Sequence, residues 1–208
     1  MGRNPLIIGI TGRIASGKDT VSKIISNKYG FCEINADKLG HLVLHKKKEE
    51  IVKIFGQKIL NTQNEIDRLL IRNLVFNDSK ELKKLESISH PIILNKIKKI
   101  LIQNQSTKIL INAALLFKIN LEKFCNYIIV VKAKTHIIKN RLSYSMPNVD
   151  LNIINKILKI QKDIFFKKNI INLRIINIIN NKNYAYLEKE IERKMQGIIN
   201  YERFKRKQ

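Results

Sequence analysis

The chain alternates between short apolar runs and longer segments in which apolar residues recur every three or four positions. Residues 5–11, PLIIGIT, form an apolar run that leads into a glycine-rich loop, which predicts a strand buried on both faces. Residues 21–29 have apolar positions at helical spacing, and Gly30 follows as a C-terminal cap. Residues 31–35, FCEIN, predict a second strand. This order predicts a βαβ unit with parallel strands and a right-handed crossover.

The segment from about residue 39 to residue 105 contains no convincing strand. Helical periodicity is present in residues 49–55, 65–76, 80–88 and 91–103. His90-Pro91 predicts the start of the last of these helices, because a proline in the first turn of a helix loses no hydrogen bond. We therefore expect a helical insertion between strands of one sheet.

The sheet is predicted to resume after this insertion. Residues 107–117 and 125–133 each contain an apolar run suited to a buried strand. Helices are expected in residues 136–142 and 151–165, with a polar, weakly patterned stretch between them. A last strand is predicted in residues 173–179, and a C-terminal helix from about residue 184 to residue 201.

The sequence GRIASGK, residues 12–18, lies between the first predicted strand and its helix and has the spacing G-x-x-x-x-G-K. Its glycines allow successive backbone N–H groups to converge on phosphate oxygens, and the following helix adds its positive end. The alternative is a glycine-rich turn with a surface lysine, but the flanking strand and helix favour phosphate binding. Lys18 is expected to reach the β- and γ-phosphates. The predicted ATP-binding residues are Gly12, Ala15, Ser16, Gly17, Lys18, Asp19 and Thr20.

Two aspartates accompany this loop. Asp19 stands directly after Lys18, where a phosphate loop usually has serine or threonine. The plain explanation is that the helix dipole favours an acidic residue in the first turn. Asp37 follows the second predicted strand, near the carboxyl edge where open α/β sheets bind ligands. It is explained equally well as the N-cap of the next helix.

The formal net charge of +23 points first to nucleic acid. However, lysine, isoleucine and asparagine are over-used along the whole chain, and their codons are rich in A and T, so a biased genome explains the excess. The lysines are scattered and no nucleic-acid recognition motif is present. We therefore expect no specific nucleic-acid partner.

The length of 208 residues fits one α/β domain. No apolar run approaches the roughly 20 residues needed to cross a bilayer, and the N-terminus has no apolar signal core. We expect a cytoplasmic protein without a membrane partner, and the sequence leaves its oligomeric state open. Cys32 and Cys125 lie among apolar residues and are expected to be buried thiols.

Beyond the loop, the chain resembles the dephospho-CoA kinases of coenzyme A biosynthesis over nearly its whole length. Asn-Ala-Asp at residues 35–37 is similar to the Asp-Ala-Asp motif of that family. In the helical segment, the residues at family positions are Asp67-Arg68, Phe76 and His90-Pro91. INAALLFK, residues 111–118, matches a strand that leads to Pro-Leu-Leu-Phe-Glu, and residues 141–161 match a lid with a downstream glutamine.

The resemblance implies ATP-dependent phosphorylation of the ribose 3′-hydroxyl of dephospho-CoA, with Mg²⁺ present. Lys18 would neutralise the transferring charge, Asp37 would hold or deprotonate the hydroxyl, and Arg141 would reach in from the lid. The implied substrate-binding residues are Asp37, Arg68, His90 and Gln161. A surface ion pair explains Arg68 comparably well, a cap explains His90, and a place on a helix surface explains Gln161.

The fold class that follows is α/β: a P-loop NTPase three-layer fold with a parallel sheet, a helical substrate-binding insertion and a lid. We expect a single domain over residues 1–208, with its core in about residues 1–38, 106–138 and 170–208. The acceptor-binding insertion would span about residues 39–105, and the lid about residues 139–169.

Several positions depart from the family pattern, namely Asn35, Asn112, Ala114, Lys118 and Ser145. The family pairs a neutral hydroxyl after the lysine with a carboxylate at the end of the third strand, whereas here Asp19 and Asn112 reverse that order. Mg²⁺ takes hard oxygen ligands and keeps several waters, so either position can supply the one charged contact. We therefore predict Asp19 and Asn112 as metal residues.

Two alternative functions remain open at this point. One is another P-loop kinase that acts on a nucleoside or nucleotide. The other is a basic nucleic-acid-binding protein with an inactive loop. The departures also allow a weakened kinase or a pseudokinase.

Overall fold

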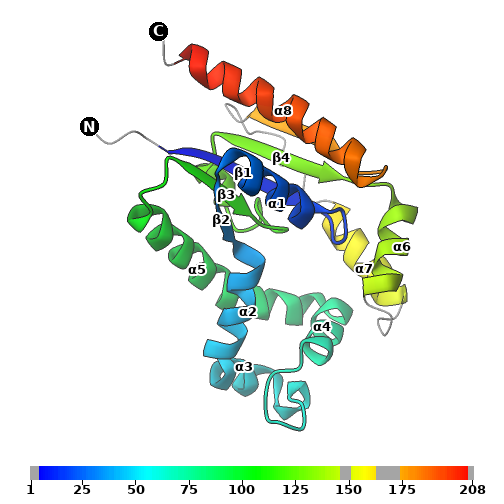
Figure 1. Cartoon of the computed structure of the whole chain (residues 1–208). Coiled ribbons are helices and arrows are strands. Elements are labelled where there is room, and N and C mark those ends of the chain that lie inside the picture. Colours follow the sequence, from blue (N-terminus) through cyan, green and yellow to red (C-terminus); the bar gives the residue numbers. More distant parts are fainter. Residues whose placement is uncertain (1–4, 146–150, 163–173, 206–208) are drawn as a thin grey trace.

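The protein is built on a five-stranded parallel sheet with the strand order β2-β3-β1-β4-β5 (Figure 1). The computed structural model describes residues 5–145, 151–162 and 174–205. The strands are β1 (Leu6–Gly12), β2 (Cys32–Asn35), β3 (Lys108–Asn112), β4 (Tyr127–Lys132) and β5 (Arg174–Ile179). β1 lies in the middle of the sheet and is buried almost throughout, as its uninterrupted apolar run predicts.

Helices cover both faces of this sheet. On one face, α1 (Lys18–Tyr29) and α8 (Tyr184–Lys205) share a hydrophobic core with β1 and β4. On the other face, α2 (Ala36–Lys46) and α5 (Ser79–Gln103) share a second core with β3 and with the segment after it. The expected three-layer α/β architecture is therefore confirmed.

The segment between β2 and β3 is helical, as expected. After α2 come α3 (Lys48–Phe55), a short 3-10 helix (Gln57–Ile59) and α4 (Arg68–Asn77), followed by α5. These helices bury a small core of their own: Ile51, Phe55, Ile59, Ile71 and Val75. Within residues 39–105, all of which are described, β-pairing is limited to one antiparallel bridge between Leu60 and Ile66.

The predicted helix start at His90-Pro91 is wrong, because Pro91 lies inside the continuous 25-residue helix α5. A proline in a helix interior costs about 3 kcal/mol, since it removes one hydrogen bond and crowds the preceding turn. Packing on both sides of the proline offsets this cost. Leu82 and Leu85 pack on the small helical core, whereas Ile93 and Ile97 are buried against the sheet.

The predicted lid contains most of α6 (Thr135–Ser145), whose first residues fall in the predicted core, and all of α7 (Leu151–Lys162). Four of their side chains, Ile138, Leu142, Ile154 and Leu158, form a cluster that packs against Ile14 and Ala15 of the glycine-rich loop. The predicted weakly patterned stretch of the lid, the end of the helix expected to residue 165, and the start of the final core segment lie partly outside the described residues.

The two cysteines differ in their surroundings. Cys125 is buried, and burial raises the pKa of its thiol to about 12. Cys32 is exposed, so the prediction that it is buried is wrong. Cys32 begins β2, which is an edge strand of the sheet. Among the described helices, none has the length and apolar character to cross a membrane.

Candidate active site

The glycine-rich loop connects β1 to α1 at the carboxyl end of the sheet (Figure 1). Two of its residues adopt left-handed backbone conformations, Ala15 with φ 54° and Gly17 with φ 95°. Such alternation turns successive peptide N–H groups toward one concave side, where an anion binds. A Cβ on Gly12 would lie 2.4 Å from Ser16 Oγ and 2.7 Å from the carbonyl oxygen of Val131, so only glycine fits there.

Lys18 is the centre of the charged groups at this edge. Its Nζ atom lies 2.6 Å from Asp37 Oδ2 and 3.0 Å from Asp19 Oδ1, and it donates to Asn112 Oδ1 at 3.3 Å. Burial alone would lower the pKa of this ammonium, but the carboxylates of Asp37 and Asp19 outweigh burial and raise that pKa. The lysine is therefore held charged in a largely buried position.

Asp37 is fixed by one contact with α1 and one with the segment that follows β3. Besides the ion pair with Lys18, its Oδ1 atom accepts a hydrogen bond from the backbone N–H of Ala114 at 3.2 Å. The alternative reading of Asp37 as a helix N-cap is wrong. Asn35 caps α2 instead, through a hydrogen bond of 3.0 Å from Lys38 N to its Oδ1 atom. Asp37 thus lies in the first turn of α2 with its carboxylate facing the loop.

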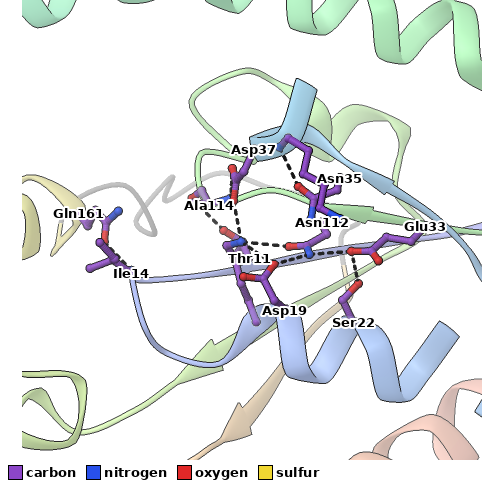
Figure 2. Close-up of polar contacts among 12 residues, drawn as sticks. Thr11, Ile14, Asp19, Ser22, Glu33, Asn35, Asp37, Asn112, Ala114 and Gln161 are labelled. Atoms are coloured by element: carbon purple, nitrogen blue, oxygen red, sulfur yellow. Dashed lines mark hydrogen bonds and ion pairs between the residues drawn. The ribbon is translucent and has the colours of Figure 1, made fainter. Parts of the chain in front are cut away.

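Asn112, at the end of β3, forms hydrogen bonds with the carboxylates of Asp19 and Glu33 (Figure 2). Its Nδ2 atom donates to Asp19 Oδ1 and to Glu33 Oε1, each at 2.8 Å, and the residue is fully buried. Ser22 Oγ also donates to Glu33 Oε1, at 2.7 Å. Burial would raise the pKa of the Asp19 carboxyl, but the hydrogen bond from Asn112 and the charge of Lys18 lower it overall.

The lid contacts the loop through polar groups as well as through apolar packing. Arg141, on α6, donates from Nη1 to the carbonyl oxygens of Ala15 and Ser16, both at 3.2 Å. Its Nη2 atom donates to the backbone oxygen and to Oδ1 of Asn180, at 3.1 and 3.2 Å. From α7, Gln161 Oε1 accepts from Ile14 N at 2.8 Å (Figure 2). Gln161 therefore binds the loop and does not merely lie on the surface of its helix.

A cavity of about 920 Å³ extends from the loop toward the helical insertion. Of the predicted residues, Ala15, Gly17, Lys18, Asp19, Thr20, Asp37, His90, Arg141 and Gln161 line it. Gly12, Ser16, Arg68 and Asn112 do not line the cavity. Ser16, within the loop, and Asn112, at the end of β3, are instead buried, and Arg68 is an exposed residue at the start of α4.

The end of the cavity at the helical insertion contains basic groups that were not among the predicted site residues. His41 and Arg72 line it. Desolvation, followed by the charge of Arg68, lowers the pKa of His41, so Arg68 acts on the cavity wall from outside. Burial also lowers the pKa of His90, although the charge of Glu86 opposes it, and Lys118 adds to the lowering. The signal for Arg72 was available in the sequence, one helical turn after Arg68 on the same helix.

Lys118 has a definite partner in this wall. Its ammonium pairs with Glu86 Oε1 at 2.5 Å, and both residues line the cavity. Glu86 lies on α5, one turn before His90. The departure from the family pattern at Lys118 is thus matched by an oppositely charged side chain.

The glycine-rich loop ends in Lys18, which lies between two carboxylates, and Arg141 contacts the same loop from the lid. This arrangement is that of a P-loop phosphotransferase. The model of the dephospho-CoA kinase family matches residues 6–182. A dephospho-CoA kinase from Borreliella burgdorferi is 88% identical over 204 residues, which are 98% of this chain and all of that protein. The chain belongs to the dephospho-CoA kinase family, whose members catalyse the last step of coenzyme A biosynthesis.

Solved structures agree with this assignment. A dephospho-CoA kinase from Campylobacter jejuni is 27% identical, with a TM-score of 0.58 over 92% of this chain and 96% of that one. The Thermus thermophilus protein TT1252 shares the fold, with 24% identity and a TM-score of 0.73 over 95% of this chain and 98% of that chain. The family and the enzyme class predicted from the sequence are confirmed, and the two alternative functions give way to this assignment.

Proposed function

We propose that this chain transfers the γ-phosphoryl group of ATP to the ribose 3′-hydroxyl of dephospho-CoA through Lys18, Asp37 and Arg141. The observation that carries the proposal is the position of Asp37, whose Oδ2 atom lies 2.6 Å from Lys18 Nζ at the meeting point of loop and cavity. An acceptor hydroxyl beside Asp37 is then also beside the lysine that contacts the transferring phosphoryl group. Phosphoryl transfer depends on this kind of alignment more than on covalent chemistry.

Each of these three residues has its own task in the proposal. Asp37 accepts the hydrogen bond of the attacking hydroxyl and orients it, because the contact with Ala114 N leaves its carboxylate little freedom to rotate. Lys18 neutralises charge on the phosphoryl oxygens. Within the described chain, the hydrogen bonds of Arg141 go only to neutral oxygen atoms, so no carboxylate neutralises its positive charge. Arg141 brings this charge to the same phosphoryl oxygens.

Magnesium is part of the proposal, and the residues present fit it unequally. Asp19 fits, because its side chain is 63% exposed and lines the cavity, while Lys18 and Asn112 both contact the same oxygen, Oδ1. Asn112 does not fit as a direct ligand, because Lys18 occupies its oxygen and two carboxylates occupy its nitrogen. We assign Asn112 the role of orienting Asp19. When bound, Mg²⁺ neutralises charge on the ATP phosphates.

The described residues contain no group of three or more acidic, histidine or cysteine side chains placed to hold a metal. A Mg²⁺ site of few protein ligands is consistent with that, because this ion usually keeps waters and binds substrate phosphates. Asp19 also stands in the first turn of α1, where the dipole favours it without any metal. Direct measurement of Mg²⁺ dependence separates these two explanations.

For the acceptor, we propose that His90, His41 and Arg72 face the anionic part of dephospho-CoA, with Arg68 contributing its charge from outside the cavity. Gln161 belongs to the nucleotide side, since it binds the loop at Ile14. We keep the predicted division into core, insertion from about residue 39 to residue 105, and lid from about residue 139 to residue 169. We also keep the cytoplasm as the predicted place of the reaction.

The test is incubation of the purified protein with ATP, Mg²⁺ and dephospho-CoA, followed by mass detection of the phosphorylated product. We expect coenzyme A, and a preference for dephospho-CoA over adenosine and AMP in competition. A protein that binds ATP normally and forms no coenzyme A would be a pseudokinase, and the proposal would then be wrong. Omitting Mg²⁺ from the same reaction tests the metal.

A further inference from the structure

The peptide between Ser16 and Gly17 is held from one side by two side chains that are distant in the sequence. The carbonyl oxygen of Ser16 accepts from Asn180 Nδ2 at 2.9 Å and from Arg141 Nη1 at 3.2 Å. Arg141 also binds the carbonyl oxygen of Ala15, at 3.2 Å. Two neighbouring carbonyl groups of the phosphate loop are thus drawn toward the lid side.

The planar trans geometry of a peptide makes this contact consequential. In such a peptide the C=O and N–H bonds point in opposite directions, so fixing the Ser16 carbonyl also fixes the direction of the Gly17 N–H. No described residue accepts a hydrogen bond from that N–H, and Gly17 lines the cavity. An N–H without a protein partner at the start of a helix is the group that an anion contacts.

Asn180 is itself rigidly placed. It directly follows β5, its backbone N–H donates to Lys132 O at 2.8 Å, and only 5% of the residue is exposed. A Cβ built on Gly17 would lie 2.1 Å from Asn180 Nδ2. The asparagine therefore fills the space that a side chain at position 17 would need, in addition to the strain that φ 95° would impose on it.

From this geometry we infer that Asn180 is a positioning residue for nucleotide binding, which acts through the Ser16–Gly17 peptide. Its amide donates to the Ser16 carbonyl and accepts from Arg141, so one buried side chain fixes the positions of the loop and the lid arginine relative to each other. Asn180 itself need not touch the nucleotide. The inference rests on the proposed function only in that the loop binds phosphate.

Two substitutions separate the parts of this role. Asn180→Ala removes both the donor and the acceptor. Asn180→Asp keeps an acceptor for Arg141 but replaces the donor with an oxygen that faces the Ser16 carbonyl oxygen, so that contact becomes repulsive. Asn181→Ala is the matched control, because Asn181 accepts from Lys134 N at 2.8 Å and forms no hydrogen bond with the loop, all of whose residues the structure describes.

The experiment measures dissociation constants for ADP and ATP without metal, by calorimetry on the full chain, together with the urea midpoint of each variant. We expect both Asn180 variants to bind nucleotide about tenfold more weakly, the loss typical of one buried hydrogen bond that positions a ligand group. The Michaelis constant for ATP should rise with it, and that for dephospho-CoA should stay within about twofold. Asn181→Ala should bind nucleotide as the wild type does.

Nucleotide binding is measurable whether or not the protein forms coenzyme A, so failure of the proposed function would not decide this test. Wild-type nucleotide affinity in both Asn180 variants would overturn the inference. So would wild-type affinity in Asn180→Asp alone, because the donor to Ser16 is the group that matters here. Equal losses for ATP and dephospho-CoA that follow a loss of stability would make Asn180 merely structural, and would also overturn the inference.

Discussion

Asn112→Asp is the substitution whose effect the structure predicts most sharply. It places a carboxylate oxygen where a nitrogen now donates to Asp19 and Glu33, each at 2.8 Å, while the contact with Lys18 at 3.3 Å is kept. At an effective dielectric constant near 20, each like-charge contact at 2.8 Å costs about 6 kcal/mol and the lysine contact returns about 5 kcal/mol. The unrelaxed net cost is therefore about 7 kcal/mol.

Two effects reduce that figure. Asp19 and Glu33 are partly in water, so screening and rotation weaken both repulsions. One carboxyl of the three can also take up a proton, which limits the cost at pH 7 to about 4 kcal/mol for a group with an ordinary pKa near 4. We therefore expect Asn112→Asp to lower the free energy of unfolding at pH 7 by about 2–4 kcal/mol.

The sign of the pH dependence follows from the proton uptake. In the Asn112→Asp protein the folded state binds a proton more tightly than the unfolded state does, so its stability falls as pH rises. The difference from the wild type should be largest at pH 7 and shrink toward pH 4. The assay is urea unfolding of the protein without nucleotide or metal, at several pH values between these limits.

Glu33→Gln provides both the control and the rescue. Alone it should change stability by less than about 0.5 kcal/mol, because a glutamine oxygen can still accept from Asn112 and Ser22. In the Asn112→Asp protein it should recover about 1–3 kcal/mol, because the glutamine amide can turn and donate to the new carboxylate. Simple additivity of the two changes, or a pH-independent loss, would refute this reasoning.

The same network affects what happens when the reversed order of Asp19 and Asn112 is changed back to that of the family. Asp19→Ser with Asn112→Asp would restore the family arrangement at two positions, but Glu33 would still face the new carboxylate. We therefore expect the double variant to regain only part of the Mg²⁺-dependent activity, and the triple variant with Glu33→Gln to regain more. Activity against free Mg²⁺ for Asp19→Ser alone, the double variant and the triple variant measures this, and equal rescue by the double and triple variants would exclude a role for Glu33.

Three further predictions concern other residues. Asp37→Asn should lower turnover by orders of magnitude and change ATP affinity little; steady-state kinetics test this, and a variant that loses stability but keeps turnover would contradict it. Lys118→Glu should raise the Michaelis constant for dephospho-CoA, since two carboxylates would then meet in the cavity wall, and adding Glu86→Lys should reverse most of the rise; no recovery would argue against the ion pair. Pro91→Ala should stabilise the protein, by up to about 3 kcal/mol, because it restores a helix hydrogen bond; an unchanged or lower melting temperature would show that the proline is needed for packing.

Much of the fold could be predicted from the sequence because its signals are local. The apolar run before the glycine-rich loop, the loop spacing and the helical periodicity after Gly30 each depend on residues a few positions apart. These signals predicted the parallel α/β sheet and the helical insertion. The error at Pro91 has the same origin, since a local preference for a helix start was overcome by packing on two separate cores.

The site was only partly predictable, for a physical reason that particular residues illustrate. Lys18 and Asp37 follow from the positions of their strands, because carboxyl ends of parallel strands meet at one edge of a sheet. Glu33 lies inside a strand and Asn180 directly after one, but neither belongs to a motif that would single it out in the sequence. Their roles arise from contacts across 79 and 164 residues of chain, with Asn112 and with Ser16. Such contacts depend on strand order and register, which only the tertiary structure decides.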